Sequence, residues 1–166
     1  RDVAKLNLPK DQEIACVTQT TLSLDDTKSI LETIKEKFSK VIEPRKDDIC
    51  YATTNRQNAV KNIAAKCDLF IVIGANNSSN SLRLVEVAKQ YGAKNSILVE
   101  NVDEFDTSVI NNIQSVGITA SASAPEVLVQ NFIQYLKENY IINMYEQEYI
   151  REDINFNIPQ QLKMTR

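Results

Sequence analysis

The sequence predicts a parallel α/β fold, in which short apolar strands alternate with amphipathic helices. The strongest indication is the segment 68–73 (DLFIVI), a nearly continuous apolar run typical of a central parallel strand covered on both faces. The second indication is the regular alternation of strand-like and helix-like segments between residues 13 and 139. Such alternation favours a parallel sheet whose crossover connections are right-handed.

The first part of the chain is expected to contain one strand, one helix and a linker. Residues 13–18 (EIACVT) are a candidate for a short strand. Ser23 and Asp26 have the spacing of a capping box, which predicts a helix over residues 24–40. The apolar residues of this helix recur at helical spacing and share one face: Ile30, Leu31, Ile34 and Phe38. A proline within a charged run predicts a linker over residues 41–48.

The rest of the chain repeats the strand–helix unit. Residues 49–52 are expected to form a short strand that carries Cys50. The further elements, in order, are a helix over 54–66, the strand 68–73, a polar loop over 74–81, a helix over 82–91, a strand over 96–99, a short helix over 102–113, a strand over 115–119, a small-residue loop over 120–123 and a helix over 124–139. From residue 140 the pattern is irregular, and residues 154–159 (INFNIP) are interpreted as an extended arm.

Composition excludes several classes of function. The 166 residues include 19 basic and 22 acidic side chains, and the net charge of −3 argues against a nucleic-acid partner. No apolar run approaches the roughly 18–20 residues that a membrane span requires. The chain has no histidine, which excludes Ser–His and Cys–His nucleophile pairs and His-ligated zinc. Its three glycines are too few and too far apart for a GxGxxG motif or a P-loop.

Three cysteines are present, Cys16, Cys50 and Cys67, and no CxxC pair occurs. An odd number of cysteines without a secretory signal indicates a reducing compartment and no disulfide framework. Cys16 lies within an expected strand and Cys67 at the end of an apolar helix, so both are interpreted as packing residues. Spacing alone predicts no metal site, because a lone cysteine such as Cys50 is more often a core residue than a ligand.

Two loops of small polar residues are the candidate binding elements. Residues 74–81 (GANNSSNS) follow the strongest strand, and residues 120–126 (ASASAPE) follow the last expected strand. Both are expected at the carboxyl edge of the sheet, and both open into a helix N-terminus that favours an anion. Ser123 and Glu126 have the spacing of a helix N-cap and its capping-box acid. Either loop alone is compatible with an ordinary capped connection, but the two together predict a phosphate or diphosphate site.

Several longer motifs occur in order along the chain. They are VTQTTLS at 17–23, Asp25–Asp26, DICYATTNRQ at 48–57, NSSNS at 77–81 with Arg83–Leu84, and GITASASAPEVLV at 117–129. Together they closely resemble the 4-hydroxy-3-methylbut-2-enyl diphosphate reductase family, also called LytB. The resemblance extends from about residue 18 to the end of the chain.

The resemblance implies an enzyme of three similar parallel-sheet α/β lobes in a trefoil-like arrangement around a central cluster. This chain would hold the end of the second lobe (1–46), the complete third lobe (47–139) and a C-terminal arm (140–166). The first lobe and most of the second would be missing. Because Arg1 is not an initiator methionine, we expect the sequence to be a fragment.

The resemblance also implies roles for individual residues. The family binds a [4Fe–4S] cluster through three cysteines, and of the cysteines here only Cys50 matches such a motif. Thr20 matches the residue that contacts the substrate hydroxyl and the proton-delivery network. The residues expected to hold the diphosphate are Ser78, Ser79, Asn80 and Ser123. The family's catalytic glutamate has no match, since Glu126 is interpreted as a helix-capping acid. The family's diphosphate-binding histidines have none either, because the chain has no histidine. We therefore expect the chain alone to be inactive.

The implied reaction is a reductive dehydroxylation in the non-mevalonate isoprenoid pathway. The iron not bound by cysteine acts as a Lewis acid on the allylic hydroxyl, and two electrons and protons then expel water to give isopentenyl and dimethylallyl diphosphates. The implied partners are a small allylic diphosphate and an electron donor such as a ferredoxin or flavodoxin system, without nucleic acid or membrane. The implied location is the bacterial cytoplasm or a plastid-type organelle.

A second class of function remains open. The chain could be a non-catalytic α/β domain that binds a phosphate ligand, or an inactive remnant of the enzyme. The sequence encoded upstream of Arg1 discriminates between these hypotheses, because the reductase requires two further cysteines and histidines there.

Overall fold

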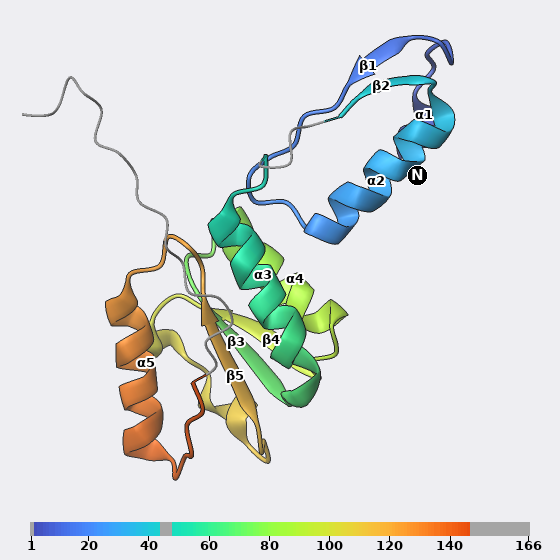
Figure 1. Ribbon diagram of the computed structural model, residues 1–166. Helices are drawn as coiled ribbons and strands as arrows, with labels where there is room; N and C mark the ends of the chain where they lie inside the picture. The colour runs from blue at the N-terminus through green and yellow to red at the C-terminus, as the bar shows by residue number, and fades with distance from the viewer. Residues whose placement is uncertain (1, 44–47, 147–166) are drawn as a thin grey trace, which may run out of the picture.

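The computed structural model describes residues 2–43 and 48–146, which form two unequal parts (Figure 1). The smaller part contains α1 (Asp2–Lys5), β1 (Glu13–Ala15), α2 (Leu24–Lys37) and β2 (Lys40–Ile42). The larger part contains α3 (Tyr51–Ile63), η1 (Ala64–Lys66), β3 (Leu69–Ile73), α4 (Ser79–Gln90), β4 (Asn95–Val99), η2 (Val102–Glu104), η3 (Thr107–Ile110), β5 (Val116–Ala120) and α5 (Glu126–Asn139). Every strand pairing is parallel, so the predicted mixed α/β class with parallel sheets is confirmed.

The smaller part is a two-stranded parallel sheet flanked by helices. Strand β1 pairs with β2, with Ile14 opposite Val41. Ser23 caps α2 as predicted, because its hydroxyl oxygen accepts a hydrogen bond from the Asp26 N–H at 3.2 Å. The expected linker over 41–48 was wrong at its start: extended backbone at Phe38 ends α2 early, which leaves residues 40–42 free to pair with β1. Residues 44–47 lie outside the described part.

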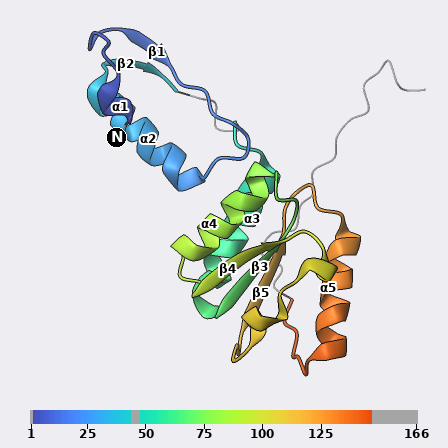
Figure 2. The same cartoon turned by 180° about the vertical axis from the view of Figure 1, so that it is seen from behind.

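The larger part is a three-layer α/β unit. Its sheet has the order β4-β3-β5, so β3 is the central strand, and all five of its residues are buried. Helices α3 and α4 cover one face of the sheet, and α5 covers the other, as Figure 2 shows from behind. Side chains of β3 alternate between two apolar clusters: Phe70 and Val72 face α3 and α4, whereas Ile71 and Ile73 face α5.

A carboxylate at the start of β3 joins the beginnings of all three strands. Asp68 accepts hydrogen bonds from the Lys94 ammonium at 2.5 Å, the Gln114 N–H at 3.1 Å and the Ser115 hydroxyl at 3.0 Å. These bonds hold the pKa of Asp68 down at about 2, the Lys94 bond having the largest effect and the Gln114 and Ser115 bonds adding to it. Because the strands are tied together at their amino ends, their carboxyl ends leave the sheet side by side.

Three helix starts differ from the sequence prediction. The strand expected over 49–52 was wrong, because Cys50 is the N-cap of α3 and the helix begins at Tyr51. Helix α4 begins at Ser79, three residues before the predicted start, so most of the polar NSSNS motif lies in its first turn. The expected cap at Ser123 was also wrong: α5 has Pro125 as its N-cap and begins at Glu126. Neither Cys50 nor Pro125 makes a side-chain capping bond, so no capping residue marks these two starts in the sequence. Ser78, which caps α4, stands among several polar residues that could serve equally well.

The connections carry two further differences. The helix predicted over 102–113 is instead two short 3₁₀ turns, η2 and η3. Within residues 141–146 there is no regular element, in agreement with the irregular pattern expected there. The arm expected at 154–159 lies outside the described residues. Among the helices of the described ranges, none combines the length and apolar character needed to cross a bilayer.

Candidate functional site

The two polar loops leave the sheet from neighbouring strands, at one edge. Residue 74 follows the central strand β3, and Ser121 follows β5, which pairs with β3 along its whole length. The Ser121 N–H donates to the Ile73 carbonyl at 2.9 Å, so the parallel ladder continues into the second loop. The expectation that both loops lie at the carboxyl edge of the sheet is therefore met.

Gly74 is the point at which the loops touch. A Cβ atom at this position would lie 2.3 Å from Ser81 Oγ and 2.8 Å from Ser121 Oγ, closer than real Cβ contacts allow. The hydroxyl groups of Ser81, from α4, and Ser121, from the second loop, therefore converge over the bare glycine backbone. Glycine is required here because any side chain would occupy the position of a serine hydroxyl.

The first turn of α4 presents the residues of the NSSNS motif. Ser78 is the N-cap, and its hydroxyl oxygen accepts a hydrogen bond from the Ser81 N–H at 3.3 Å. Ser79 is exposed, whereas Asn80 is buried, with 6% of its surface accessible. Asn80 Oδ1 has no hydrogen-bond partner in the described part of the chain, and the Ser81 and Ser121 hydroxyls have none either. Among the described residues, Asn80 Oδ1 and the Ser81 hydroxyl thus lie unpartnered in the first turn of α4, and the Ser121 hydroxyl lies unpartnered at the start of the second loop, so this edge of the sheet holds polar groups that the fold itself does not use.

Ser123 lies in the second loop between β5 and α5 and is exposed. It does not cap α5, so its hydroxyl is not committed to the helix. The structure thus brings the loop of Ser78, Ser79 and Asn80 beside the loop of Ser123, and the hydroxyl groups of Ser81 and Ser121 both lie close to Gly74 between them.

Arg56 brings positive charge to the second loop. Its Nε–H donates to the Ala120 carbonyl at 3.1 Å, and one terminal nitrogen donates to the Ala52 carbonyl at 3.4 Å. The guanidinium group is therefore fastened at the end of β5, next to Ser121. The sequence motif included Arg56 without indicating this role, because the contact joins residues 64 positions apart.

Thr20 and Cys50 meet at the start of α3. The Cys50 N–H donates to the Thr20 carbonyl at 3.2 Å, which joins the segment after β1 to the helix N-cap. Cys50 is half-buried and its side chain makes no capping hydrogen bond, so the thiol is not used by the helix itself. Thr20 is exposed beside it. The positive end of the helix dipole favours a negatively charged ligand atom at the Cys50 position.

A buried glutamine holds this arrangement together, although the sequence did not suggest it. Gln57 is fully buried in α3; its Nε2 donates to the Leu22 carbonyl at 2.9 Å, and its Oε1 accepts from the Leu24 N–H at 3.2 Å. The residues between Thr20 and α2 are thereby fastened to α3. The only signal in the sequence is a polar residue at a position of α3 that faces the interior.

Asp25 adds a charged contact between the same segments. It pairs with Lys61 of α3 at 2.8 Å and accepts a hydrogen bond from the Tyr91 hydroxyl at 2.6 Å. The hydrogen bond from Lys61, followed by that from Tyr91, lowers the pKa of Asp25. Burial acts to lower the pKa of Lys61, but its hydrogen bond and ion pair with Asp25 outweigh that effect and raise it. A second ion pair joins Asp26 to Arg83 of α4 at 3.1 Å.

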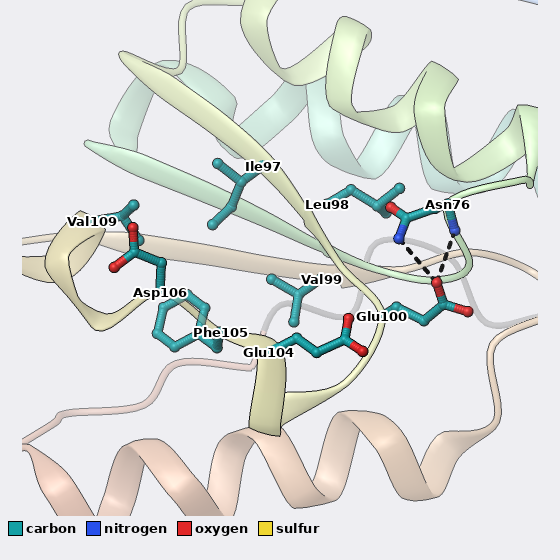
Figure 3. A pocket seen from close by; sticks show the side chains of 9 residues that line it. All are labelled: Asn76, Ile97, Leu98, Val99, Glu100, Glu104, Phe105, Asp106 and Val109. Atoms are coloured by element: carbon teal, nitrogen blue, oxygen red, sulfur yellow. Dashed lines mark hydrogen bonds between the residues drawn. The ribbon is translucent and has the colours of Figure 1, made fainter.

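A cavity of about 240 Å³ lies between the end of β4, the following 3₁₀ turns and Asn76 of the first loop (Figure 3). Apolar side chains of β4 and the 3₁₀ turns form its walls, and three carboxylates lie among its lining residues: Glu100, Glu104 and Asp106. Glu100 accepts hydrogen bonds from the Asn76 backbone N–H at 3.3 Å and from the Asn76 amide at 3.0 Å. The carboxylates repel a phosphate, so this cavity does not extend the anion site. Asn76 instead ties the first loop to the end of β4.

The other two cysteines are placed differently from Cys50. Cys67 is buried, its thiol donates to the Ile63 carbonyl at 3.3 Å, and burial raises its pKa, which disfavours the thiolate that a metal needs. Cys16 directly follows β1, and its N–H donates to the Ile42 carbonyl at 3.0 Å. Across residues 2–43 and 48–146, no group of three His, Cys, Asp or Glu side chains is arranged to hold a metal ion.

Comparison with known proteins adds independent information. The family model described as LytB protein matches residues 1–137. The chain is 45% identical over 163 residues to the 4-hydroxy-3-methylbut-2-enyl diphosphate reductase of Actinobacillus succinogenes, a match that covers 98% of this chain and 52% of that protein. The chain thus spans about half the length of the curated relatives it matches.

Two solved structures are similar. The E-1-hydroxy-2-methyl-but-2-enyl-4-diphosphate reductase of Plasmodium falciparum has a TM-score of 0.85 at 35% identity, over 96% of this chain and 51% of that chain. A structure of (E)-4-hydroxy-3-methyl-but-2-enyl diphosphate reductase, described as the terminal enzyme of the non-mevalonate pathway, has a TM-score of 0.51 at 30% identity. That match covers 78% of this chain and 45% of the other.

Proposed function

The chain belongs to the LytB protein family, and we propose that it provides about half of a 4-hydroxy-3-methylbut-2-enyl diphosphate reductase. In this proposal residues 1–46 complete one α/β lobe, residues 47–139 form another, and residues 140–166 form an arm. The two-stranded sheet of the smaller part supports the division, because a parallel sheet of two strands is too small to be stable without further strands. The remaining lobe structure would come from the half of the relatives' length that this chain does not span.

The proposed reaction removes the hydroxyl group of an allylic diphosphate. The C–O bond breaks, two electrons enter the allyl unit, one proton adds to carbon and another leaves with the hydroxyl as water. A [4Fe–4S] cluster, when bound, would supply the electrons and a Lewis-acidic iron for the hydroxyl. A one-electron donor of the ferredoxin or flavodoxin type would reduce the protein.

Cys50 would be the ligand that this chain contributes to such a cluster. The free thiol at the N-terminus of α3 fits this role, because it makes no capping bond and is only half-buried. One thiolate cannot hold a cluster alone, so the other ligands would come from the rest of the protein.

Thr20 would orient the substrate hydroxyl. Its carbonyl bond to the Cys50 N–H supports the proposal, since that bond keeps the exposed threonine next to the proposed metal ligand. A threonine hydroxyl cannot supply a net proton near neutral pH, so its role is to position the leaving group and relay a proton from an acid elsewhere.

The diphosphate would bind between the two loops. Ser78, Ser79 and Asn80 at the N-terminus of α4 would hold one part of it, and Ser123 would approach from the second loop. The helix dipole of α4 and the guanidinium group of Arg56 both favour negative charge at this edge. The observation that carries the whole proposal is that Thr20 meets Cys50 in a chain that is 45% identical to a named reductase.

The test uses a protein of the relatives' full length that contains this chain. Cys50→Ser is expected to lose most of the bound iron, measured by iron analysis and by the visible absorbance of the cluster, because one of its thiolates is gone. Cys67→Ala and Cys16→Ala are the matched controls and are expected to retain iron. Full iron loading of Cys50→Ser would contradict the assignment.

A second test addresses the alternative of a phosphate-binding domain without catalysis. The 166-residue chain alone is expected to form neither a stable cluster nor product after anaerobic reconstitution, whereas the full-length protein is expected to do both. Failure of the full-length protein to turn over, with diphosphate binding retained, would favour the non-catalytic function.

A further inference from the structure

Ser81 and Ser121 are buried hydroxyl groups whose partners the fold does not supply. Their residues have 0% and 1% of their surface accessible, and neither Oγ has a hydrogen-bond partner within the described ranges. A buried hydroxyl without a partner destabilises the folded chain, so two of them at one place require an explanation. Neither side chain is reachable from solvent, which excludes direct contact with a ligand in this conformation.

Both hydroxyl groups lie over the same glycine. The Cβ position of Gly74 would be 2.3 Å from one Oγ and 2.8 Å from the other, so the two oxygens are neighbours across a backbone that has no side chain. Ser81 belongs to the first turn of α4, directly after Ser78 and Asn80. Ser121 begins the second loop, two residues before Ser123. Each hydroxyl is thus rigidly connected to one of the two groups proposed to hold the diphosphate.

We propose that Ser81 and Ser121 are positioning residues that form a hydroxyl–hydroxyl hydrogen bond across Gly74 when a diphosphate is bound. The inference rests on the proposed diphosphate site. An anion held by both loops draws the start of α4 and the start of the second loop together, and a small approach converts two unpaired hydroxyls into one pair. The bond then links the two loops, so it favours a ligand whose two phosphate groups contact both loops over a single phosphate that contacts one.

The experiment measures binding of inorganic pyrophosphate and of inorganic phosphate by calorimetry, in a protein of the relatives' full length that contains this chain. Ser81→Ala and Ser121→Ala are each expected to weaken pyrophosphate binding roughly fivefold, the scale of one neutral hydrogen bond. The double variant is expected to be no weaker than either single variant, because all three lack the same bond. Binding of single phosphate is expected to change much less, since one phosphate does not bridge the loops.

Ser96→Ala is the matched control. Ser96 is also buried, with 2% of its surface accessible and no partner for its hydroxyl in the described structure, but it lies in β4 away from Gly74. Its removal is expected to leave the ratio of pyrophosphate to phosphate affinity unchanged. Gly74→Ala is a second probe, expected to weaken pyrophosphate binding more than either serine variant because its Cβ displaces Ser81 Oγ.

Three results would overturn the inference. Unchanged pyrophosphate affinity in both serine variants, additive losses in the double variant, or an equal loss in Ser96→Ala would each exclude a specific pair, with thermal unfolding confirming that the variants fold. If the full-length wild-type protein binds no pyrophosphate, the proposed diphosphate site itself fails and the inference falls with it. If instead the wild type binds pyrophosphate and both serine variants bind it equally well, the diphosphate site stands and only the serine pair is excluded.

Discussion

Thr20 and Asn80 reach the candidate site by different routes. Thr20 lies in a turn before α2 and is placed by a backbone hydrogen bond from Cys50, whereas Asn80 is placed by the first turn of α4. Thr20 is exposed, and Asn80 is buried with an amide oxygen that has no partner in the described structure. Their substitutions should therefore affect different steps, catalysis for Thr20 and diphosphate binding for Asn80.

Thr20→Val tests the hydroxyl group of Thr20 without changing its shape. In the full-length protein this variant is expected to lower turnover roughly tenfold or more, on the scale of lost proton-transfer assistance. Iron content and the affinity for substrate should stay close to wild type, because the carbonyl bond to Cys50 remains. Steady-state kinetics with iron analysis measures both. Wild-type turnover would show that Thr20 is only a turn residue.

Asn80→Ala tests the polar contact at the start of α4. It is expected to weaken pyrophosphate binding roughly tenfold or more, because a hydrogen bond to a charged oxygen contributes about 1.5–3 kcal/mol. Asn80→Asp, which has nearly the same size, should bind even more weakly, since its negative charge repels the ligand. Titration calorimetry compares the three proteins. Equal affinity of Asn80→Asp and wild type would place the anion elsewhere.

The elements of the larger part work as a rigid frame for these residues. The buried strand β3 aligns β4 and β5, and the Asp68 carboxylate ties the amino ends of all three strands together. The carboxyl ends consequently release their loops at adjacent positions, where Gly74 allows them to touch. The stability of this frame should depend on the charge of Asp68, which leads to a pH prediction.

Asp68 should make the unfolding free energy depend on pH in an acidic window. Its pKa is about 2 in the folded chain against 3.8 for the unperturbed carboxyl, so its contribution is fully present above pH 3.8. The contribution is lost as the pH falls from 3.8 through 2, because the folded state must then take up a proton. Urea unfolding of wild type and Asp68→Asn is expected to differ most at neutral pH and to converge across this window. Asp103→Asn, at an exposed site in η2, is the control. A constant difference at all pH values would contradict the prediction.

Among the described residues, the two parts of the molecule meet through polar contacts, and both apolar clusters belong to the larger part. Gln57 holds Leu22 and the start of α2 against α3, and two ion pairs, Asp25 with Lys61 and Asp26 with Arg83, add to this contact. The position of Thr20 beside Cys50 therefore depends on a few hydrogen bonds and ion pairs. Loss of the buried glutamine should separate the two parts without unfolding the larger one.

Gln57→Leu is expected to release the segment around Thr20. The substitution leaves the Leu22 carbonyl and the Leu24 N–H without partners, each costing about 1–3 kcal/mol if it stays buried. Faster hydrogen exchange at Leu24 and faster proteolysis near residues 16–22 should follow, with β3 still protected. Asn62→Leu, at an exposed position of the same helix, should change neither rate. Unchanged exchange at Leu24 in Gln57→Leu would show that Gln57 does not hold the parts together.

The sequence by itself determined the fold class and most elements. The apolar segment that became β3, the cap at Ser23 and the alternation of strands and helices depend on residues close together in the chain, so local patterns reveal them. The family motifs likewise lie in continuous stretches. The helix starts at residues 51 and 126 were misplaced because neither has a side-chain cap, and the start at residue 79 because several polar residues around Ser78 could cap the helix.

Only the tertiary structure decided which distant residues meet. The strand order β4-β3-β5, the bond from Cys50 to Thr20, the anchoring of Arg56 at Ala120 and the two serines over Gly74 all join separate segments. Such contacts arise when helices and strands pack against one another, and no local periodicity encodes them. The polar residues concerned also show no pattern of their own, because one buried glutamine or serine resembles any other until its partners, or their absence, are seen.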